Sequence, residues 1–563
     1  MIFRERPCHN SAFGINVQHF PKPCGMRAKQ FQRFVVCLAI VVVVKWNVLL
    51  DPPMWDAAFG LFPAAAELAD NGFDLPKLLH QSTYHEGGPN CHAESIVTWI
   101  TAGVLYTFGK GQLAFVVLHL LTFAATAWTL TVLFSLTADC YGRREAWLVC
   151  LALLACPLFS VQAGAMYFEM PLAACAITAL AAYSNGQLKR AIGWSILAVL
   201  VKQAGIVVPG ALIAAILLRS GPLGKRLGLA VAISVPAFLA AIAPLLGTRL
   251  LDSYSKPPEF HSWWLFMTHQ HLPYLRAIPD ILVAYALYLV CSLLLAGRVW
   301  SALRHDGTVA TSTTSTAVSD ATTEVVGVNQ SRTSDRRASQ LLSVGFLQML
   351  AFAGFFFFVP YVGRLEIYCL PRYFVFLLPM LFFGLVHFAV TTSRPLASVG
   401  LMMVTVWFVA NRDGAWYPLM QPNNGAIAER AESCRWLAEN QRIIVNAASR
   451  LPVDSLVLYG LPEHYFLNHP WMGYATRIHP GGRCVTFAAE RPASLKVADL
   501  PDRFYIILDS MILGGRDLRA VLREAGDDPT RQVRVIDESG RSPFSVKLYE
   551  VTRNPEMRIS SRQ

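Results

Sequence analysis

Long runs of apolar residues, separated by short polar turns, make up most of the first 411 residues of the chain. A helix needs ~20 apolar residues to cross a bilayer, because each residue rises ~1.5 Å and the hydrocarbon core is ~30 Å thick. Candidate runs lie at 34–50, 114–138, 146–163, 170–185, 191–207, 208–219, 226–247, 275–297, 341–361, 372–391 and 396–411. The pattern predicts an α-helical polytopic membrane protein with about 11 transmembrane helices. A shorter run at 96–108 predicts a helix at the membrane interface.

The hydrophobic pattern changes after residue 411. A run with helical periodicity at 426–448 is followed by short β-rich runs at 455–460, 503–509, 533–537 and 544–551, with a second helical run at 516–526. Strands interleaved with helices are typical of a layered α/β fold. Residues 412–563 are therefore predicted to form a C-terminal soluble α/β domain, in which Cys434 and Cys484 either pair or stay as thiols.

A second interruption lies within the membrane part. Residues 306–336 are rich in Ser and Thr and poor in large apolar side chains. Such a segment buries too little surface to offset the entropy of ordering its backbone. We therefore predict a disordered cytoplasmic linker over 298–340.

Composition and charge place the chain in a membrane and orient it there. Only 15% of the residues are charged, the mean hydropathy is +0.41, and the net charge is +11. The predicted inner loops carry 19 Lys and Arg, whereas the first outer loop, 51–95, has seven acids and one base. Positive charge marks cytoplasmic loops, so the tail 1–33 is predicted to be cytoplasmic and 412–563 to lie on the periplasmic or extracellular side. The basic balance is thus no sign of nucleic-acid binding.

Several polar residues are predicted at the outer membrane face, where each needs a partner or a use. Asp56 follows Trp55 just beyond the first span, and Glu67 and Asp70 share one face of an apolar-periodic stretch. An aspartate in this position could instead simply cap a helix.

Two more charges are predicted at outer turns between spans. Glu169 stands among Met, Phe and Pro residues, and Lys202 stands at the apex of the 191–207 and 208–219 hairpin. Glu169 could merely favour a helix N-terminus, and Lys202 could reach up to the lipid head groups.

The outer turn 361–373 carries Arg364 and Arg372, followed by Tyr373. An arginine fork suits a phosphate because its paired donors match the phosphate oxygens. The alternative is an ion pair with Glu366 or Glu169.

Carboxylates and cations on one membrane face fit a defined chemistry. A base removes a proton from an acceptor hydroxyl, which attacks an anomeric carbon whose leaving group is a lipid phosphate. Cations that bind the departing charge lower the barrier.

These residues resemble the motifs of the GT-C fold membrane glycosyltransferases, in the branch that includes protein mannosyltransferases and bacterial aminoarabinose transferases. The matching segments are Trp55-Asp56, Phe168-Glu169-Met170-Pro171, Lys202-Gln203 before Pro209, and Pro371-Arg372-Tyr373. The resemblance covers residues 34–411, a GT-C-like transmembrane domain. It implies that Asp56 is the catalytic base, that Glu169 binds acceptor or orients the site, and that Lys202 and Arg372 lie near the lipid phosphate.

The sequence departs from this family where many members have two adjacent acids, because Ala57 follows Asp56. Asp51 is a competing candidate for the base. Six histidines in the outer loops have spacings that match no tight metal site, namely His80, His85, His92, His261, His269 and His271. No metal ligands are therefore assigned, and a divalent cation is left open as a cofactor.

The sequence thus predicts an integral membrane glycosyltransferase that uses a polyprenyl-phosphate-linked sugar on the outer face of the cytoplasmic membrane. Its acceptor could be a lipid, a glycan or a protein. The alternative is a polytopic membrane transporter or lipid flippase without glycosyl transfer, which would carry charged residues near the membrane midplane.

Overall fold

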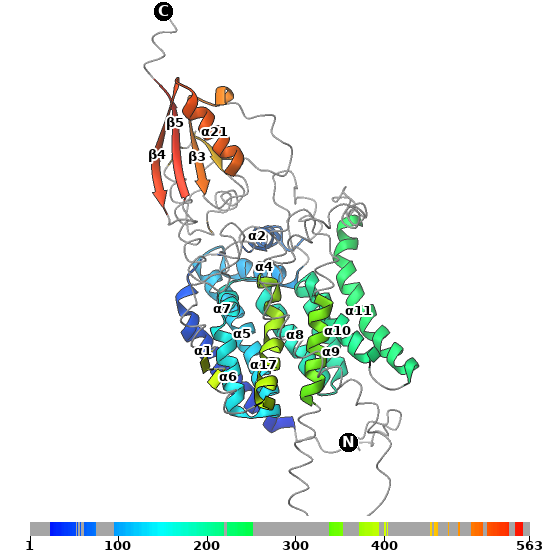
Figure 1. The fold of residues 1–563 in the computed structure, drawn as a ribbon. Coiled ribbons are helices and arrows are strands. Elements are labelled where there is room, and N and C mark those ends of the chain that lie inside the picture. The colour runs from blue at the N-terminus through cyan, green and yellow to red at the C-terminus, as the bar shows by residue number, and fades with distance from the viewer. Residues whose placement is uncertain are drawn as a thin grey trace, which may run out of the picture.

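A computed structural model gives the arrangement of much of the chain. It describes residues 23–51, 53, 57, 61–74, 95–218, 222–250, 337–352, 371–392, 399–400, 402–403, 451–452, 455–459, 471, 482–484, 497–509, 515–539 and 546–554. These residues form a bundle of helices and, near the C-terminus, a β-sheet with one helix against it (Figure 1).

The bundle follows the apolar runs of the sequence. Its helices are α1 (Pro23–Lys45), α2 (Phe62–Asp70), α4 (Ile96–Phe108), α5 (Gln112–Tyr141), α6 (Arg143–Ala155), α7 (Pro157–Gly164), α8 (Glu169–Ser184), α9 (Leu188–Val201), α10 (Val207–Leu218), α11 (Leu223–Leu250) and α17 (Leu378–Thr392). Three short 3₁₀ helices adjoin them, η1 (Trp46–Val48), η4 (Gln203–Ile206) and η7 (Pro371–Leu377). A further helical stretch covers 337–352.

Within the described ranges, four helices are long and apolar enough to cross a membrane, or up to five if a bent pair counts as one span. The mostly helical architecture is as predicted, while the number of eleven crossings stays a prediction. The predicted run at 275–297 lies outside the described residues, and only a few residues of 396–411 lie inside them.

The predicted continuous run at 146–163 is two helices. The axes of α6 and α7 differ by 74°, and Cys156 separates them with an extended backbone. Pro157 is the first residue of α7, a position where the missing N–H costs nothing, but its ring cannot continue the preceding helix. Hydropathy alone could not show this break, because Pro157 interrupts the run by a single residue.

Helix α5 passes through the core of the bundle and carries several buried threonines. The hydroxyls of Thr122, Thr126 and Thr131 donate to the carbonyl oxygens four residues earlier, at 3.0, 2.9 and 2.7 Å. Trp128 donates across to the hydroxyl of Thr178 on α8 at 2.9 Å. Polar groups within an apolar bundle are stable only when they are hydrogen-bonded, and α5 meets this condition largely within its own backbone.

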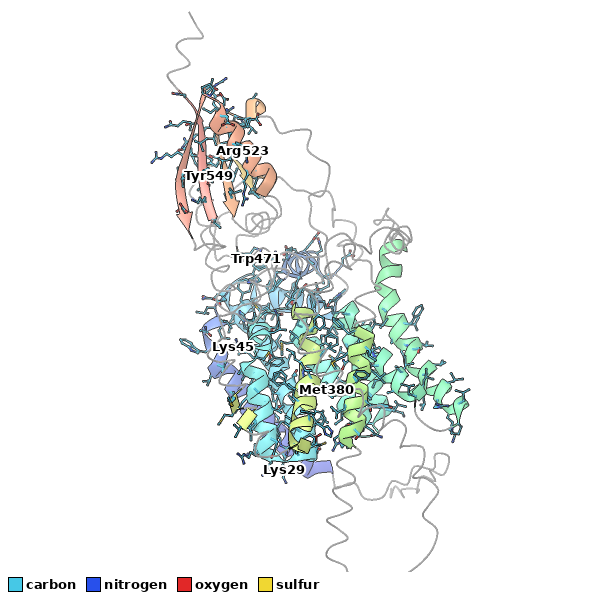
Figure 2. All side chains as sticks on the ribbon, viewed as in Figure 1. Lys29, Lys45, Met380, Trp471, Arg523 and Tyr549 are labelled. Carbon is cyan, nitrogen blue, oxygen red and sulfur yellow. The ribbon has the colours of Figure 1, made fainter. Side chains whose placement is uncertain are left out.

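The two ends of the bundle differ. Lys29 and Lys45 mark opposite ends of α1 (Figure 2), and α2 and α4 lie at the Lys45 end, between the bundle and the C-terminal sheet (Figure 1). We call this the outer end of the bundle. The start of α1 and the C-terminal sheet therefore lie at opposite ends of the bundle, while their placement on the two sides of a membrane stays a prediction.

The opposite end is closed by an arginine from the helical stretch 337–352. Arg337 donates to Asp139 of α5 at 2.8 Å and to Asn185, just after α8, at 2.6 Å. Residues 337–340, the last four of the predicted disordered linker, are helical. The rest of that linker, 298–336, lies outside the described residues.

The C-terminal sheet has five strands in the order β2-β1-β3-β5-β4. The strands are β1 (Leu456–Tyr459), β2 (Gly482–Cys484), β3 (Arg503–Asp509), β4 (Arg531–Ser539) and β5 (Val546–Arg553), with η10 (Val497–Asp499) and α21 (Gly515–Asp527). Strands β1, β2 and β3 are parallel, whereas β3, β5 and β4 are antiparallel. Helix α21 packs Leu518, Val521 and Ala525 against one face of the sheet.

Four strands and one helix of this region match the predicted runs. The three-residue β2 was not predicted, because Gly482, Arg483 and Cys484 have little strand propensity. The predicted helix 426–448 lies outside the described residues, and so does Cys434, so its pairing with Cys484 stays untested.

The turn from α21 to β4 makes a pH-dependent contribution to stability. The hydroxyl and N–H of Thr530 donate to Asp528 Oδ1 at 2.6 and 2.8 Å, and these hydrogen bonds lower the pKa of Asp528. A depressed pKa adds stability above the unfolded-state pKa of about 4, and this stability is lost as the pH falls. Asp528→Asn should therefore increase hydrogen exchange in residues 515–539 at pH 7, and this increase should shrink as the pH falls below about 4. An increase that does not depend on pH would contradict this assignment.

Candidate functional site

A buried ion pair lies at the outer end of the bundle. Lys202 Nζ lies 2.7 Å from Glu169 Oε1, and the two side chains are 9% and 3% exposed. The residues are 33 positions apart in sequence: Glu169 begins α8, and Lys202 directly follows α9. The sequence predicted both as site residues, and the structure shows that they are direct partners.

Glu169 is held by the start of α8. It is the first residue of that helix, and Leu172 N–H donates to Phe168 O at 2.9 Å to close the first turn. The positive end of the helix dipole favours a carboxylate here. Its second oxygen, Oε2, is buried and accepts no hydrogen bond from the residues that the structure describes. An unpaired buried carboxylate oxygen is costly, so Oε2 is a position where a hydroxyl or water could donate.

Lys202 stands between two helices. Helix α9 ends at Val201, Lys202 has an extended backbone, and η4 begins at the next residue. Its ammonium lies 5.4 Å from the centre of the Tyr167 ring and 6.0 Å from that of Phe168. Lys202 is therefore buried in a carboxylate and aromatic environment, which corrects the alternative in which it reaches out to lipid head groups.

The energetics of this pair favour a functional role. Removing two charges from water costs several kcal/mol per ion in a low-dielectric interior, and the Coulomb attraction often does no more than offset this cost. A stable bundle does not need such a pair. Charged groups in a membrane bundle are typically retained where substrates or ions bind. The arrangement provides a fixed ammonium that can attract an anion and a carboxylate oxygen that can accept a proton or a hydrogen bond.

Sequence reasoning missed the neighbours that hold this pair. Ser95 donates to Val201 O, next to Lys202, at 2.6 Å, and Gly205 lies against the backbone of Ala198. Tyr167 and Phe168 supply the aromatic rings. Ser95 could have been noticed as a helix cap before an apolar run, whereas only the folded structure shows that it reaches α9.

The first outer loop is described in part. Helix α2 carries Glu67 and Asp70, as predicted, and packs against α4. Asp70 is exposed and forms an ion pair with Lys110, between α4 and α5. The carbonyl of Asp51, the competing base, accepts a hydrogen bond from His119 Nε2 at 3.1 Å. Trp55 and Asp56 lie outside the described residues.

The element that carries the predicted arginine lies beside α8. Phe376 and Leu377 of η7 share an apolar cluster with Phe168 and Leu172. The backbone of Arg372 and Tyr373 belongs to η7, but their side chains are outside the described part of the structure, as is Arg364. The structure thus brings η7 next to the Glu169 helix and leaves the arginine fork itself a prediction.

In the described residues, no group of three or more His, Cys, Asp or Glu could hold a metal ion. The six histidines of the outer loops lie outside those residues. A divalent cation as cofactor therefore stays a possibility from the sequence alone.

Comparison with known proteins gives structural but no sequence matches. No protein-family model matches the chain, and no curated protein matches it by sequence. The chain is similar to two kinds of solved membrane enzyme. ArnT from Cupriavidus metallidurans, bound to undecaprenyl phosphate, is 16% identical with a TM-score of 0.43, over 92% of this chain and 97% of that one. The Archaeoglobus fulgidus oligosaccharyltransferase is 12% identical with a TM-score of 0.40, over 85% and 69%.

With TM-scores of 0.43 and 0.40 at 16% and 12% identity, the GT-C resemblance of the sequence stays a prediction.

Among the described residues of the C-terminal part, Trp471 contacts the outer end of the bundle. Its ring stacks on that of Phe115 of α5 with ring centres 5.8 Å apart, and the ring centre of Phe62 of α2 lies 6.4 Å away. Figure 2 shows Trp471 between the bundle and the sheet.

Proposed function

We propose that the protein is an integral membrane glycosyltransferase that moves a sugar from a polyprenyl-phosphate donor to an acceptor hydroxyl. The observation that supports this most is the buried Lys202–Glu169 pair at the outer end of the bundle. The ammonium of Lys202 would bind the lipid phosphate. The second carboxylate oxygen of Glu169, Oε2, would accept a hydrogen bond from the acceptor. Arg364 and Arg372 are proposed to assist with the phosphate.

The proposed reaction is a displacement at the anomeric carbon. Asp56 removes the acceptor hydroxyl proton as the oxygen attacks, a new C–O bond forms, and the bond to the phosphate oxygen breaks. The phosphate leaves with the electron pair, and Lys202 stabilises its developing charge. Glu169 orients Lys202 through Oε1 and accepts a hydrogen bond through Oε2.

Acceptor binding is proposed for the surface above this site. Trp55 and Tyr373 are candidates from the sequence, together with Glu67 and Asp70 on α2. The C-terminal domain would lie on the periplasmic or extracellular side and contact the acceptor, with the N-terminus in the cytoplasm. The acceptor class (lipid, glycan or protein) follows from none of these residues.

A transporter or flippase is the second candidate. It would place ionisable residues near the membrane midplane. In the described bundle helices other than α1, the Asp, Glu, Lys and Arg residues lie in the first or last four residues of their helix, whereas Arg33 stands midway along α1 and donates to Ser135 of α5 at 3.1 Å. This distribution favours an enzyme with its site at one membrane face over a transporter that binds its substrate at the membrane midplane.

The proposed base gives the direct test. Asp56→Asn should lower transfer of labelled sugar from undecaprenyl-phosphate sugar by about 10²- to 10⁴-fold, the usual contribution of a general base. Binding of undecaprenyl phosphate should be unchanged, because Asp56 is assigned to the acceptor side.

Asp51→Asn is the matched control, since Asp51 precedes Asp56 in the same loop and competes with it for the role. Full activity of Asp56→Asn with loss in Asp51→Asn would move the base to Asp51. Movement of labelled lipid between leaflets without any sugar transfer by the wild-type protein would overturn the enzyme in favour of the flippase.

A further inference from the structure

Ser95 makes two hydrogen bonds that join separate parts of the outer end. Its hydroxyl accepts from Val97 N–H at 3.2 Å and so caps the start of α4. The same hydroxyl donates to the carbonyl of Val201 at 2.6 Å, across 106 residues of sequence. The side chain is buried, with 4% exposed.

Val201 is the last residue of α9, and Lys202 follows it directly. The last four carbonyls of a helix have no partner within the helix. A buried carbonyl without a partner is costly. The serine hydroxyl supplies the hydrogen bond that the carbonyl of Val201 would otherwise lack within its helix. The N–H of Lys202 donates to Ala198 O at 3.2 Å, and the two bonds together fix the peptide that carries the lysine.

We propose that Ser95 is a positioning residue for Lys202. It ties the end of the first outer loop to the last peptide of α9 and thereby fixes where the ammonium meets the lipid phosphate. This role rests on the proposed function, in which Lys202 binds that phosphate. Ser95 itself contacts neither donor nor acceptor in the proposed reaction.

The test measures binding of undecaprenyl phosphate and sugar transfer in four variants of the full-length protein. Ser95→Ala removes both hydrogen bonds. Ser95→Gly also removes them but retains a residue that caps helices well, so it separates the bond to Val201 from the cap. Ser95→Thr restores the hydroxyl. Ser195→Ala removes another buried hydroxyl from α9, one that donates within its own helix to Ala191 at 2.7 Å.

We expect Ser95→Ala and Ser95→Gly each to weaken binding of undecaprenyl phosphate about tenfold, the worth of one buried hydrogen bond. Ser95→Thr should restore binding, and Ser195→Ala should bind like the wild type. Near-wild-type binding by Ser95→Gly together with weak binding by Ser95→Ala would show a helix cap and overturn the positioning role.

Lys202→Met in the same assays tests phosphate binding by Lys202 separately from the positioning role of Ser95. Loss of binding in Lys202→Met with normal binding in Ser95→Ala and Ser95→Gly would overturn only the role of Ser95. Normal binding in Lys202→Met would overturn the proposal that Lys202 binds the phosphate. The positioning role of Ser95, which depends on that proposal, would then fall as well.

Discussion

Lys202→Met should weaken binding of undecaprenyl phosphate about 100-fold and reduce sugar transfer by at least as much. A hydrogen bond to a charged group contributes ~1.5–3 kcal/mol, and the ammonium additionally neutralises the charge that develops on the leaving phosphate. Lys202→Arg should retain part of the binding, because the charge remains while its position changes.

The same substitution leaves Glu169 buried without its partner. Breaking a buried ion pair in this way costs about 3–5 kcal/mol, because the remaining charge is uncompensated. The double variant Lys202→Met with Glu169→Gln removes both charges and should unfold close to the wild-type temperature. It should nevertheless bind no undecaprenyl phosphate, which separates loss of function from loss of fold.

The matched control is the other lysine–carboxylate pair at the outer end. Lys110 pairs with Asp70, but their side chains are 30% and 60% exposed. Exposed pairs contribute ~0–1 kcal/mol, so Lys110→Met should alter stability and binding little. If Lys110→Met and Lys202→Met weakened phosphate binding equally, the effect would be one of general surface charge and the specific site would be wrong.

Gly205→Ala should destabilise the protein strongly although Gly205 touches no substrate in the proposed reaction. A Cβ at this position would lie 2.1 Å from the carbonyl oxygen of Ala198 and 2.4 Å from its carbon. Non-bonded heavy atoms attract only beyond ~3.5 Å, and both atoms belong to the backbone of α9, which cannot move aside as a side chain can. Overpacking of this kind costs ~1–3 kcal/mol or more.

The clash at Gly205 should also displace Lys202 and so disturb its ion pair with Glu169. Gly205 N–H donates to the carbonyl of Lys202 at 2.7 Å, so a shift of Gly205 displaces the lysine peptide. We expect a lower unfolding temperature and at least tenfold weaker binding of undecaprenyl phosphate.

Gly210→Ala provides the control five residues further on, in α10. No atom lies within 4 Å of a Cβ built there, and alanine favours a helix over glycine by ~1 kcal/mol. This variant should be as stable as the wild type or more so. A fully active, fully stable Gly205→Ala would show that the turn between α9 and α10 tolerates movement, and would contradict its role in holding Lys202.

Much of the secondary structure was open to prediction because it follows from local periodicity. The apolar runs gave α5, α8 and α10 to within a few residues, and the alternating runs after residue 455 gave four of the five strands. The break between α6 and α7 and the three-residue β2 were missed. Both depend on a few residues whose local signal is weak, and their neighbours in space decide their conformation.

The sequence by itself determined which side chains are costly in an apolar environment, because hydropathy and charge are properties of each residue. Glu169 and Lys202 stood out on that ground alone. Only the tertiary structure decided that they are partners, that aromatic rings surround the ammonium, and that Ser95 and Gly205 hold its peptide. The contacts from Glu169 to Lys202 and from Ser95 to Val201 join residues 33 and 106 positions apart, and chain separation of that size leaves no periodic trace in a sequence. Packing of helices brings them together, and packing is decided by all the helices at once.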